Sequence, residues 1–154
     1  MARTILIVDD DTSAREVLVQ MLEPEGYEVI QAESGEEALE LAGSLHVDAF
    51  LLDIGMPRMN GIDLCRALRR MERYSRVPII FLTGQADDVA LEEAFASGGD
   101  DFLGKPSTMA GVRVRLKNHL QRMDYLQRLE RMRRHGYYSM QHGYPRPHCS
   151  WTWR

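Results

Sequence analysis

The sequence predicts an α/β protein with a doubly wound, five-stranded parallel sheet. Short apolar runs rich in branched residues alternate five times with stretches of helical periodicity. The apolar runs are nearly continuous, as expected for strands buried on both faces, and the connections between elements are short. The length of 154 residues, with 44% hydrophobic and 27% charged residues, suits one domain and a modest extension.

The five predicted strands are apolar runs that stop at turn-forming or polar residues. Branched residues dominate the first and fourth runs, and a glycine or proline follows soon after most of them. Because all strands are expected to be parallel, their carboxyl ends should meet at one edge of the sheet. The predicted strands are residues 4–8, 27–32, 49–53, 78–83 and 101–104.

Four helices are predicted between these strands, each with a capping residue at its start. Pro24 and Gly26 should end the first helix, Gly43 the second, and Gly98 with Gly99 the fourth. The expected caps, in chain order, are Asp11 or Thr12, the capping box of Ser34 with Glu37, Asn60, and Asp87–Asp88. The expected inner faces are Val17, Leu18, Met21 and Leu22 in the first helix, and Val89, Leu91, Ala94 and Phe95 in the fourth.

The last helix should start near Ser107–Thr108 and meet no breaker before Gly136. A stripe of Val112, Leu116, Leu120 and Met123 can pack on the sheet, so the domain is assigned to residues 1–122. Residues 123–135 are interpreted as a helical extension or linker, and residues 136–154 as a disordered tail. Leu126, Leu129 and Met132 follow at spacing three. Two interpretations stay open for the extension: a solvated, fraying helix end, or a linker or homodimer helix.

Charge is distributed unevenly along the chain. Residues 1–112 carry 9 Lys/Arg and 21 Asp/Glu, a net charge of −12, whereas residues 113–154 carry 10 and 2, a net charge of +8. Because residues 1–112 are acidic, direct DNA binding by the domain is not expected.

With no apolar run of about 18 residues and no signal-peptide pattern, a cytoplasmic protein without a membrane partner is expected. His135, His142, His148 and Cys149 fit no tetrahedral metal site well.

Polar side chains stand at the ends of the predicted strands and should gather at one edge of the sheet. Asp9, Asp10 and Asp53 would repel one another there unless a cation joins them. Carboxylates and a backbone carbonyl, such as that of Gly55, suit Mg²⁺. Each acid also has a simpler role as a helix or turn cap, but their shared placement favours a site.

Thr83 and Lys105 add a hydroxyl donor and a positive charge to the same edge. With a divalent ion, these groups fit the three oxygens of a phosphoryl group. Asp53 is then the natural nucleophile, because a carboxylate can accept a phosphoryl group as an acyl phosphate. In the simpler alternatives, the Thr83 side chain only hydrogen-bonds to a loop backbone, and Lys105 is a solvated surface charge.

These motifs together resemble the receiver domain of two-component response regulators. The resemblance covers residues 3 to about 122 and rests on the following residues: Val8-Asp9-Asp10, Leu52-Asp53 with Met56-Pro57 and Gly61, Thr83-Gly84, and Lys105-Pro106. It implies the strand order 2-1-3-4-5. It also implies that Asp53 is the phosphoacceptor, that Asp10, Asp53 and the Gly55 carbonyl bind Mg²⁺ or Mn²⁺, and that Asp9 acts through water.

The resemblance further implies a phosphorylation switch and not a turnover enzyme. Lys105 would hold the phosphoryl group and its bond to Pro106 would be cis, while Thr83 and Phe102 would form the switch pair. Positions 55 and 85, here Gly55 and Gln85, would tune the phosphoryl lifetime. The implied partner is a sensor histidine kinase or a histidine phosphotransfer protein.

Three rival interpretations remain. A phosphohydrolase of the haloacid dehalogenase type needs a second Asp two residues after the nucleophile, where this chain has Gly55. A flavin-binding module needs a hydroxyl- and amide-rich phosphate loop, whereas Asp9, Asp10 and Asp11 would repel a phosphate. The third rival is a receiver that binds partners without accepting phosphate.

Overall fold

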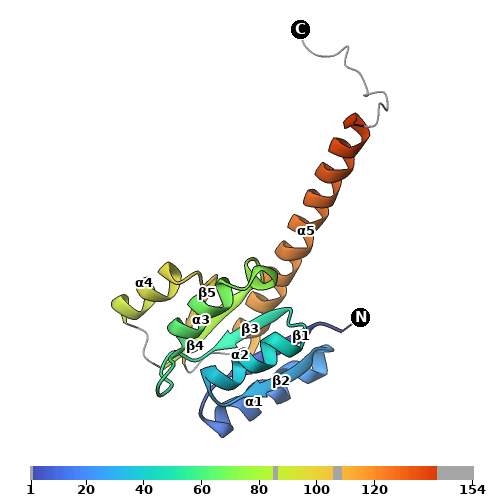
Figure 1. Ribbon diagram of the computed structural model, residues 1–154. Coiled ribbons are helices and arrows are strands. Elements are labelled where there is room, and N and C mark those ends of the chain that lie inside the picture. The colour runs from blue at the N-terminus through green and yellow to red at the C-terminus, as the bar shows by residue number, and fades with distance from the viewer. Residues whose placement is uncertain (1, 85–86, 106–108, 142–154) are drawn as a thin grey trace. The chain divides into compact units, whose positions relative to one another are not determined.

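The computed structural model describes residues 2–84, 87–105 and 109–141. Within them lies a parallel sheet of five strands in the order β2-β1-β3-β4-β5, with helices on both of its faces (Figure 1), which confirms the predicted fold class. Two compact units are distinguished, residues 1–120 and residues 121–154. The strands are β1 (Thr4–Val8), β2 (Glu28–Ala32), β3 (Ala49–Leu52), β4 (Ile79–Thr83) and β5 (Asp101–Gly104).

The helices follow the predicted order along the chain. Two short 3-10 turns, η1 (Glu23–Glu25) and η2 (Glu72–Tyr74), lie between the longer elements. Gly26 follows η1 with a φ of 93°, a conformation that glycine adopts without strain. The α-helices are α1 (Thr12–Leu22), α2 (Gly35–Ser44), α3 (Gly61–Arg69), α4 (Asp88–Ala96) and α5 (Met109–Gln141).

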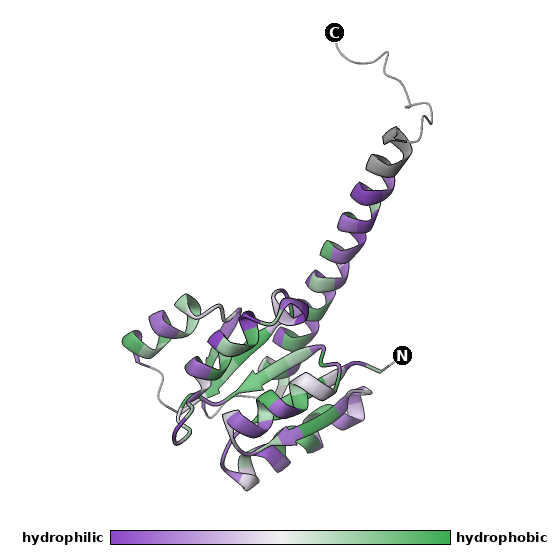
Figure 2. Ribbon diagram, viewed as in Figure 1, coloured by the Kyte–Doolittle hydropathy of each residue, from purple (hydrophilic) through white to green (hydrophobic). Residues whose placement is uncertain are grey.

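The strand register places the first and third strand ends side by side. Val8, the last residue of β1, pairs with Leu52, the last residue of β3, and with Ala32 at the end of β2. β1, β3 and β4 are buried almost throughout, and Figure 2 shows the sheet as the hydrophobic centre beneath more hydrophilic helix surfaces. Asp9 and Asp53, each one residue beyond a paired end, therefore emerge next to each other.

Side-chain caps start the helices where the sequence predicts them. The Asp11 carboxylate, and not the Thr12 hydroxyl, caps α1 by accepting from the Ser13 amide at 3.0 Å. Ser34 caps α2, but the Glu37 carboxylate accepts from the Glu33 amide and so closes the box one residue earlier than expected. Asn60 caps α3 and Asp87 caps α4 as predicted, each by accepting an amide hydrogen bond.

Two of the predicted inner faces are partly wrong. Val17 is 55% exposed although Leu18, Met21 and Leu22 are buried, because Val17 lies about 100° around the helix from Leu18. In α4 the structure buries Ala94 but leaves Val89, Leu91 and Phe95 exposed. Apolar residues are spread around α4, so only the side that carries Ala94 is covered.

The last helix extends further than the sequence predicts. α5 passes through Gly136 and ends at Gln141, since a single glycine weakens a helix without necessarily breaking it. Val112, Leu116, Leu120 and Met123 are buried, as expected, whereas Leu126, Leu129 and Met132 are exposed. Residues 142–154, including His142, His148 and Cys149, lie outside the described residues. Among the described helices none is long and apolar enough to cross a membrane.

Candidate functional site

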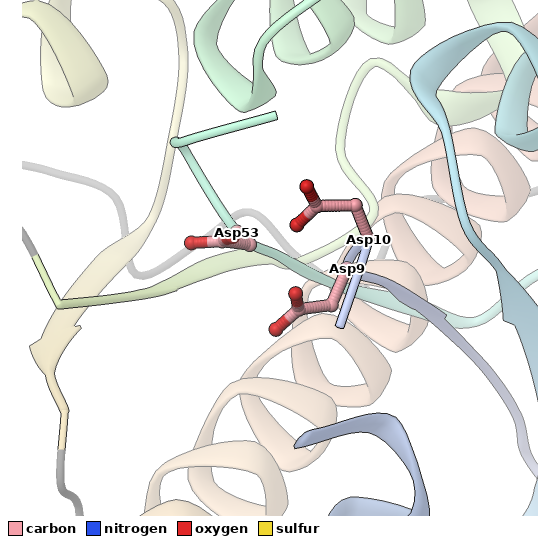
Figure 3. A group of neighbouring side chains, drawn as sticks. All are labelled: Asp9, Asp10 and Asp53. Atoms are coloured by element: carbon pink, nitrogen blue, oxygen red, sulfur yellow. The ribbon is translucent and has the colours of Figure 1, made fainter. Parts of the chain in front are cut away.

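Three carboxylates meet at the carboxyl ends of β1 and β3. Asp9 and Asp10 directly follow β1, and Asp53 directly follows β3. One carboxylate oxygen from each lies within 4.8 Å of those of the other two (Figure 3). Asp9 is buried, Asp53 is half-buried and Asp10 is exposed, so the group opens to solvent on the side of Asp10. The structure thus brings together the three acids that the sequence predicts at this edge.

Asp9 is held by two donors from different parts of the fold. One carboxylate oxygen accepts from the Asp11 amide at 2.9 Å, and the other accepts from Lys105 Nζ at 2.7 Å. The side chain of Asp9 is 4% exposed and that of Lys105 is 32% exposed. The ammonium of Lys105, just beyond β5, is therefore a direct counter-charge inside the acid group and not a solvated surface charge.

Burial, and then the neighbouring acids, disfavour the charged form of Asp53. Burial raises the pKa of the Asp53 carboxyl above its usual value, and the negative charge of Asp9 raises it further. The Lys105 ammonium and a hydrogen bond from the Gly55 amide act in the opposite direction, and Asp10 adds a smaller unfavourable charge. A cation placed among the three carboxylates would relieve this repulsion.

We expect Asp53→Asn to stabilise the metal-free protein at neutral pH. A pKa raised by folding means that the native state holds the Asp53 proton more tightly, so wild-type stability rises as pH falls through that pKa. The Asn variant carries no charge to be neutralised, so its advantage should shrink as the pH approaches the ordinary Asp range of about 4. Urea unfolding of both proteins in a chelator, at about pH 7 and about pH 4.5, measures this difference. An equal difference in the free energy of unfolding at both pH values would contradict a raised pKa of Asp53.

Two glycines flank Asp53 in space, with different constraints. A Cβ on Gly61, at the start of α3, would overlap the carbonyl oxygen of Asp53. A Cβ on Gly55 would meet nothing within 4 Å. Gly61 therefore allows the start of α3 to approach the backbone of Asp53, while no atom occupies the space that a Cβ on Gly55 would enter. The structure shows the Gly55 amide acting on Asp53; a metal-binding role for the Gly55 carbonyl stays a prediction.

The predicted switch residues lie at the ends of β4 and in β5. Thr83 is buried, and its carbonyl accepts from the Lys105 amide at 2.7 Å. Phe102 is half-buried, with its ring centroid 6.5 Å from that of Phe81. Their coupling stays a prediction. Gln85 and Pro106, and with them the predicted cis bond, lie outside the described residues.

Arg15 is a residue near the site that the sequence analysis did not identify. It lies in α1 and is 8% exposed, and its guanidinium donates to the Asp9 carbonyl at 2.5 Å. Helical spacing contained the signal, because Arg15 is three residues before Leu18 and seven before Leu22 on the buried face of the helix. An arginine at a core-facing position indicates a group that needs buried acceptors.

Comparison with known proteins agrees with this geometry. The model of the response regulator receiver domain matches residues 5–117. The DNA-binding response regulator MtrA of Mycobacterium tuberculosis is 41% identical over 123 residues, covering 77% of this chain and 53% of that protein. The transcriptional regulatory protein SrrA of Staphylococcus aureus is 38% identical over 122 residues, covering 79% and 49%. The chain therefore spans about half the length of these curated relatives.

Solved structures show the same likeness over nearly their whole length. A response regulator from Chloroflexus aurantiacus has a TM-score of 0.76 and 38% identity, with 79% of this chain and 99% of that chain covered. The receiver domain of a sensor histidine kinase from Pseudomonas aeruginosa has a TM-score of 0.73 and 31% identity, with the same coverage. That structure holds a magnesium ion coordinated in the active site cleft. The present chain belongs to the response regulator receiver domain family, whose members act as phosphoacceptor switches and not as turnover enzymes.

Proposed function

We propose that this protein accepts a phosphoryl group on Asp53 from a phosphohistidine and changes its affinity for partners as a result. The observation that carries the proposal is the meeting of Asp53 with Asp9, Asp10 and Lys105 at one edge of the sheet. Membership of the receiver family supports a sensor histidine kinase or a histidine phosphotransfer protein as the donor.

In the proposed reaction, a carboxylate oxygen of Asp53 attacks phosphorus. The new O–P bond forms as the P–N bond of the phosphohistidine breaks, and the imidazole leaves with the electron pair and takes a proton from water. Lys105 lies close enough to the acid group to contact the transferred oxygens after small side-chain movement. The open space beside Gly55 gives the phosphoryl group room to approach.

The donor set fits a small divalent cation, Mg²⁺ or Mn²⁺. Asp9, Asp10 and Asp53 are hard oxygen ligands gathered within 4.8 Å, and their mutual repulsion gives the group a reason to bind a cation. When bound, the ion supplies positive charge that offsets the charge on the phosphoryl oxygens. The magnesium ion in the related kinase receiver domain supports Mg²⁺ as the ion bound here.

The proposed switch runs from the site to β4 and β5. A phosphoryl group on Asp53 offers oxygens to the Thr83 hydroxyl and to the Lys105 ammonium. Thr83 pairs with Gly104 in the sheet, and Phe102 pairs with Phe81 two residues earlier in β4. Movement of Thr83 toward the phosphoryl group would therefore favour a new position of Phe102, and the surface around β5 would change with it.

We expect the wild-type protein to gain one phosphoryl group from acetyl phosphate in the presence of Mg²⁺, as measured by intact mass. The gain should be lost in a chelator and in Asp53→Asn. A phosphorylated Asp53→Asn protein, or an unchanged wild-type mass with Mg²⁺ present, would contradict the proposal. The latter result would instead favour a receiver that only binds partners.

We further propose that residues 123–135 contact a second copy of the chain. Tyr125, Leu129 and Met132 are exposed by 57%, 43% and 70%. They are spaced four and three residues apart, so they form one apolar stripe with coiled-coil spacing. A homodimer would bury this stripe against the same stripe of the second copy.

A further inference from the structure

The buried side chain of Arg15 is placed where it can control one of the proposed metal ligands. Arginine is rarely buried, and an ionised group that leaves water needs its donors satisfied. All three guanidinium nitrogens of Arg15 donate to neutral oxygens. Nη1 donates to the Asp9 carbonyl at 2.5 Å, Nε to the Gln31 side chain at 3.1 Å, and Nη2 to the Thr12 hydroxyl at 3.3 Å.

The contact with the Asp9 carbonyl fixes a peptide plane. The carbonyl of Asp9 and the amide of Asp10 belong to one planar unit, so a group that holds the carbonyl also sets the direction in which Asp10 leaves the strand. Asp9 itself is held independently, through its amide to the Ala32 carbonyl and through its carboxylate to Asp11 and Lys105. Asp10 is the exposed acid of the group, and Arg15 contacts the peptide unit that joins Asp9 to Asp10.

We propose that Arg15 is a positioning residue that aims the Asp10 carboxylate at the divalent cation through the Asp9–Asp10 peptide. This inference rests on the proposed cation site. The bonds to Gln31 on β2 and to Thr12 in the first turn of α1 anchor the guanidinium, and the bond to the Asp9 carbonyl transmits that rigidity to the ligand. Groups that orient metal ligands from behind commonly matter for affinity by about tenfold or more.

The sign of the effect separates positioning from simple electrostatics. Arg15 is a positive charge near a cation site, so removing it should tighten Mg²⁺ binding if charge alone mattered. If Arg15 positions Asp10, its removal should weaken binding in spite of the lost repulsion. The two explanations therefore predict changes of opposite direction for the same substitution.

The experiment is a calorimetric titration of the full chain with MgCl₂, comparing wild type with Arg15→Met, Arg15→Lys and Gln31→Met. We expect Arg15→Met to raise the Mg²⁺ Kd about tenfold. Arg15→Lys keeps one donor and should recover part of this loss. Gln31→Met removes one of the two anchoring bonds and leaves the bond to Thr12 and the contact with the Asp9 carbonyl, so its Kd should rise clearly less than that of Arg15→Met.

An Arg15→Met Kd that is unchanged or lower would overturn the inference, as would an equal loss in Gln31→Met, which would indicate general loosening of α1. If Arg15→Met does not fold, Arg15→Lys carries the test through the amide NMR resonance of Asp10. That resonance should shift in metal-free Arg15→Lys, and an unshifted resonance with a wild-type Kd would also overturn it. Failure of wild type itself to bind Mg²⁺ would instead refute the proposed cation site.

Discussion

Gly61→Ala is expected to destabilise the protein by about 2–3 kcal/mol and to slow phosphorylation of Asp53. The new methyl group would overlap the Asp53 carbonyl oxygen and would also press on the backbone of Ile54. Backbone atoms cannot rotate away as a flexible side chain can, so the start of α3 or the end of β3 has to move. The greater helix propensity of alanine, about 1 kcal/mol, offsets only part of this cost. Urea unfolding measures the first effect, and the rate of mass gain from acetyl phosphate measures the second.

Gly55→Ala is the matched control, because it adds the same methyl group two residues after Asp53. Its Cβ would meet nothing within 4 Å, so we expect a stability change within about 0.5 kcal/mol. Equal stability of the two variants would show that the approach of α3 to Asp53 is looser than the structure indicates.

Removing residues 124–154 is expected to change the particle from a dimer to a monomer in sedimentation equilibrium. The truncation deletes Tyr125, Leu129 and Met132, the stripe proposed to contact a second copy, while the proposed phosphoacceptor site lies wholly in the unit of residues 1–120. Phosphorylation of Asp53 should therefore persist in the shortened chain. Arginines flank the stripe, so added salt should strengthen the full-length dimer by screening their repulsion.

Point variants separate the stripe from the rest of the extension. Leu129→Glu places a charge within the stripe and should give a monomer, whereas Gln127→Glu adds the same charge on another side of the helix and should leave the dimer intact. A full-length chain that sediments as a monomer, both with and without phosphate on Asp53, would refute the proposed homodimer.

The fold could be predicted because local signals agree with one another. Apolar runs, glycines and capping residues each pointed to the same alternation, and caps such as Asn60 and Asp87 lie where their side chains satisfy free amides. The acid group was predictable for a related reason. Parallel strands bring their carboxyl ends to one edge, so Asp9 and Asp53 had to be neighbours once Val8 and Leu52 were paired.

What escaped prediction depends on three-dimensional detail. The inner face of α4 was misjudged because Val89 and Phe95 are as apolar as Ala94, and only tertiary packing decides which side is covered. The sequence alone leaves Lys105 as a possible surface charge, and only the structure shows its contact with the buried Asp9. Arg15 was overlooked because a charged residue interrupts an apolar pattern, although its spacing places it on the buried face.

The site of phosphorylation can be identified by locating the phosphoryl group on the chain. After reaction with acetyl phosphate and Mg²⁺, borohydride reduces an aspartyl phosphate to an alcohol and leaves phosphate esters intact. Peptide mass spectrometry should then find homoserine in place of Asp53, and only in the phosphorylated sample. Reduction at Asp9 or Asp10, or phosphate that survives on a hydroxyl side chain, would contradict the assignment of Asp53 as the phosphoacceptor.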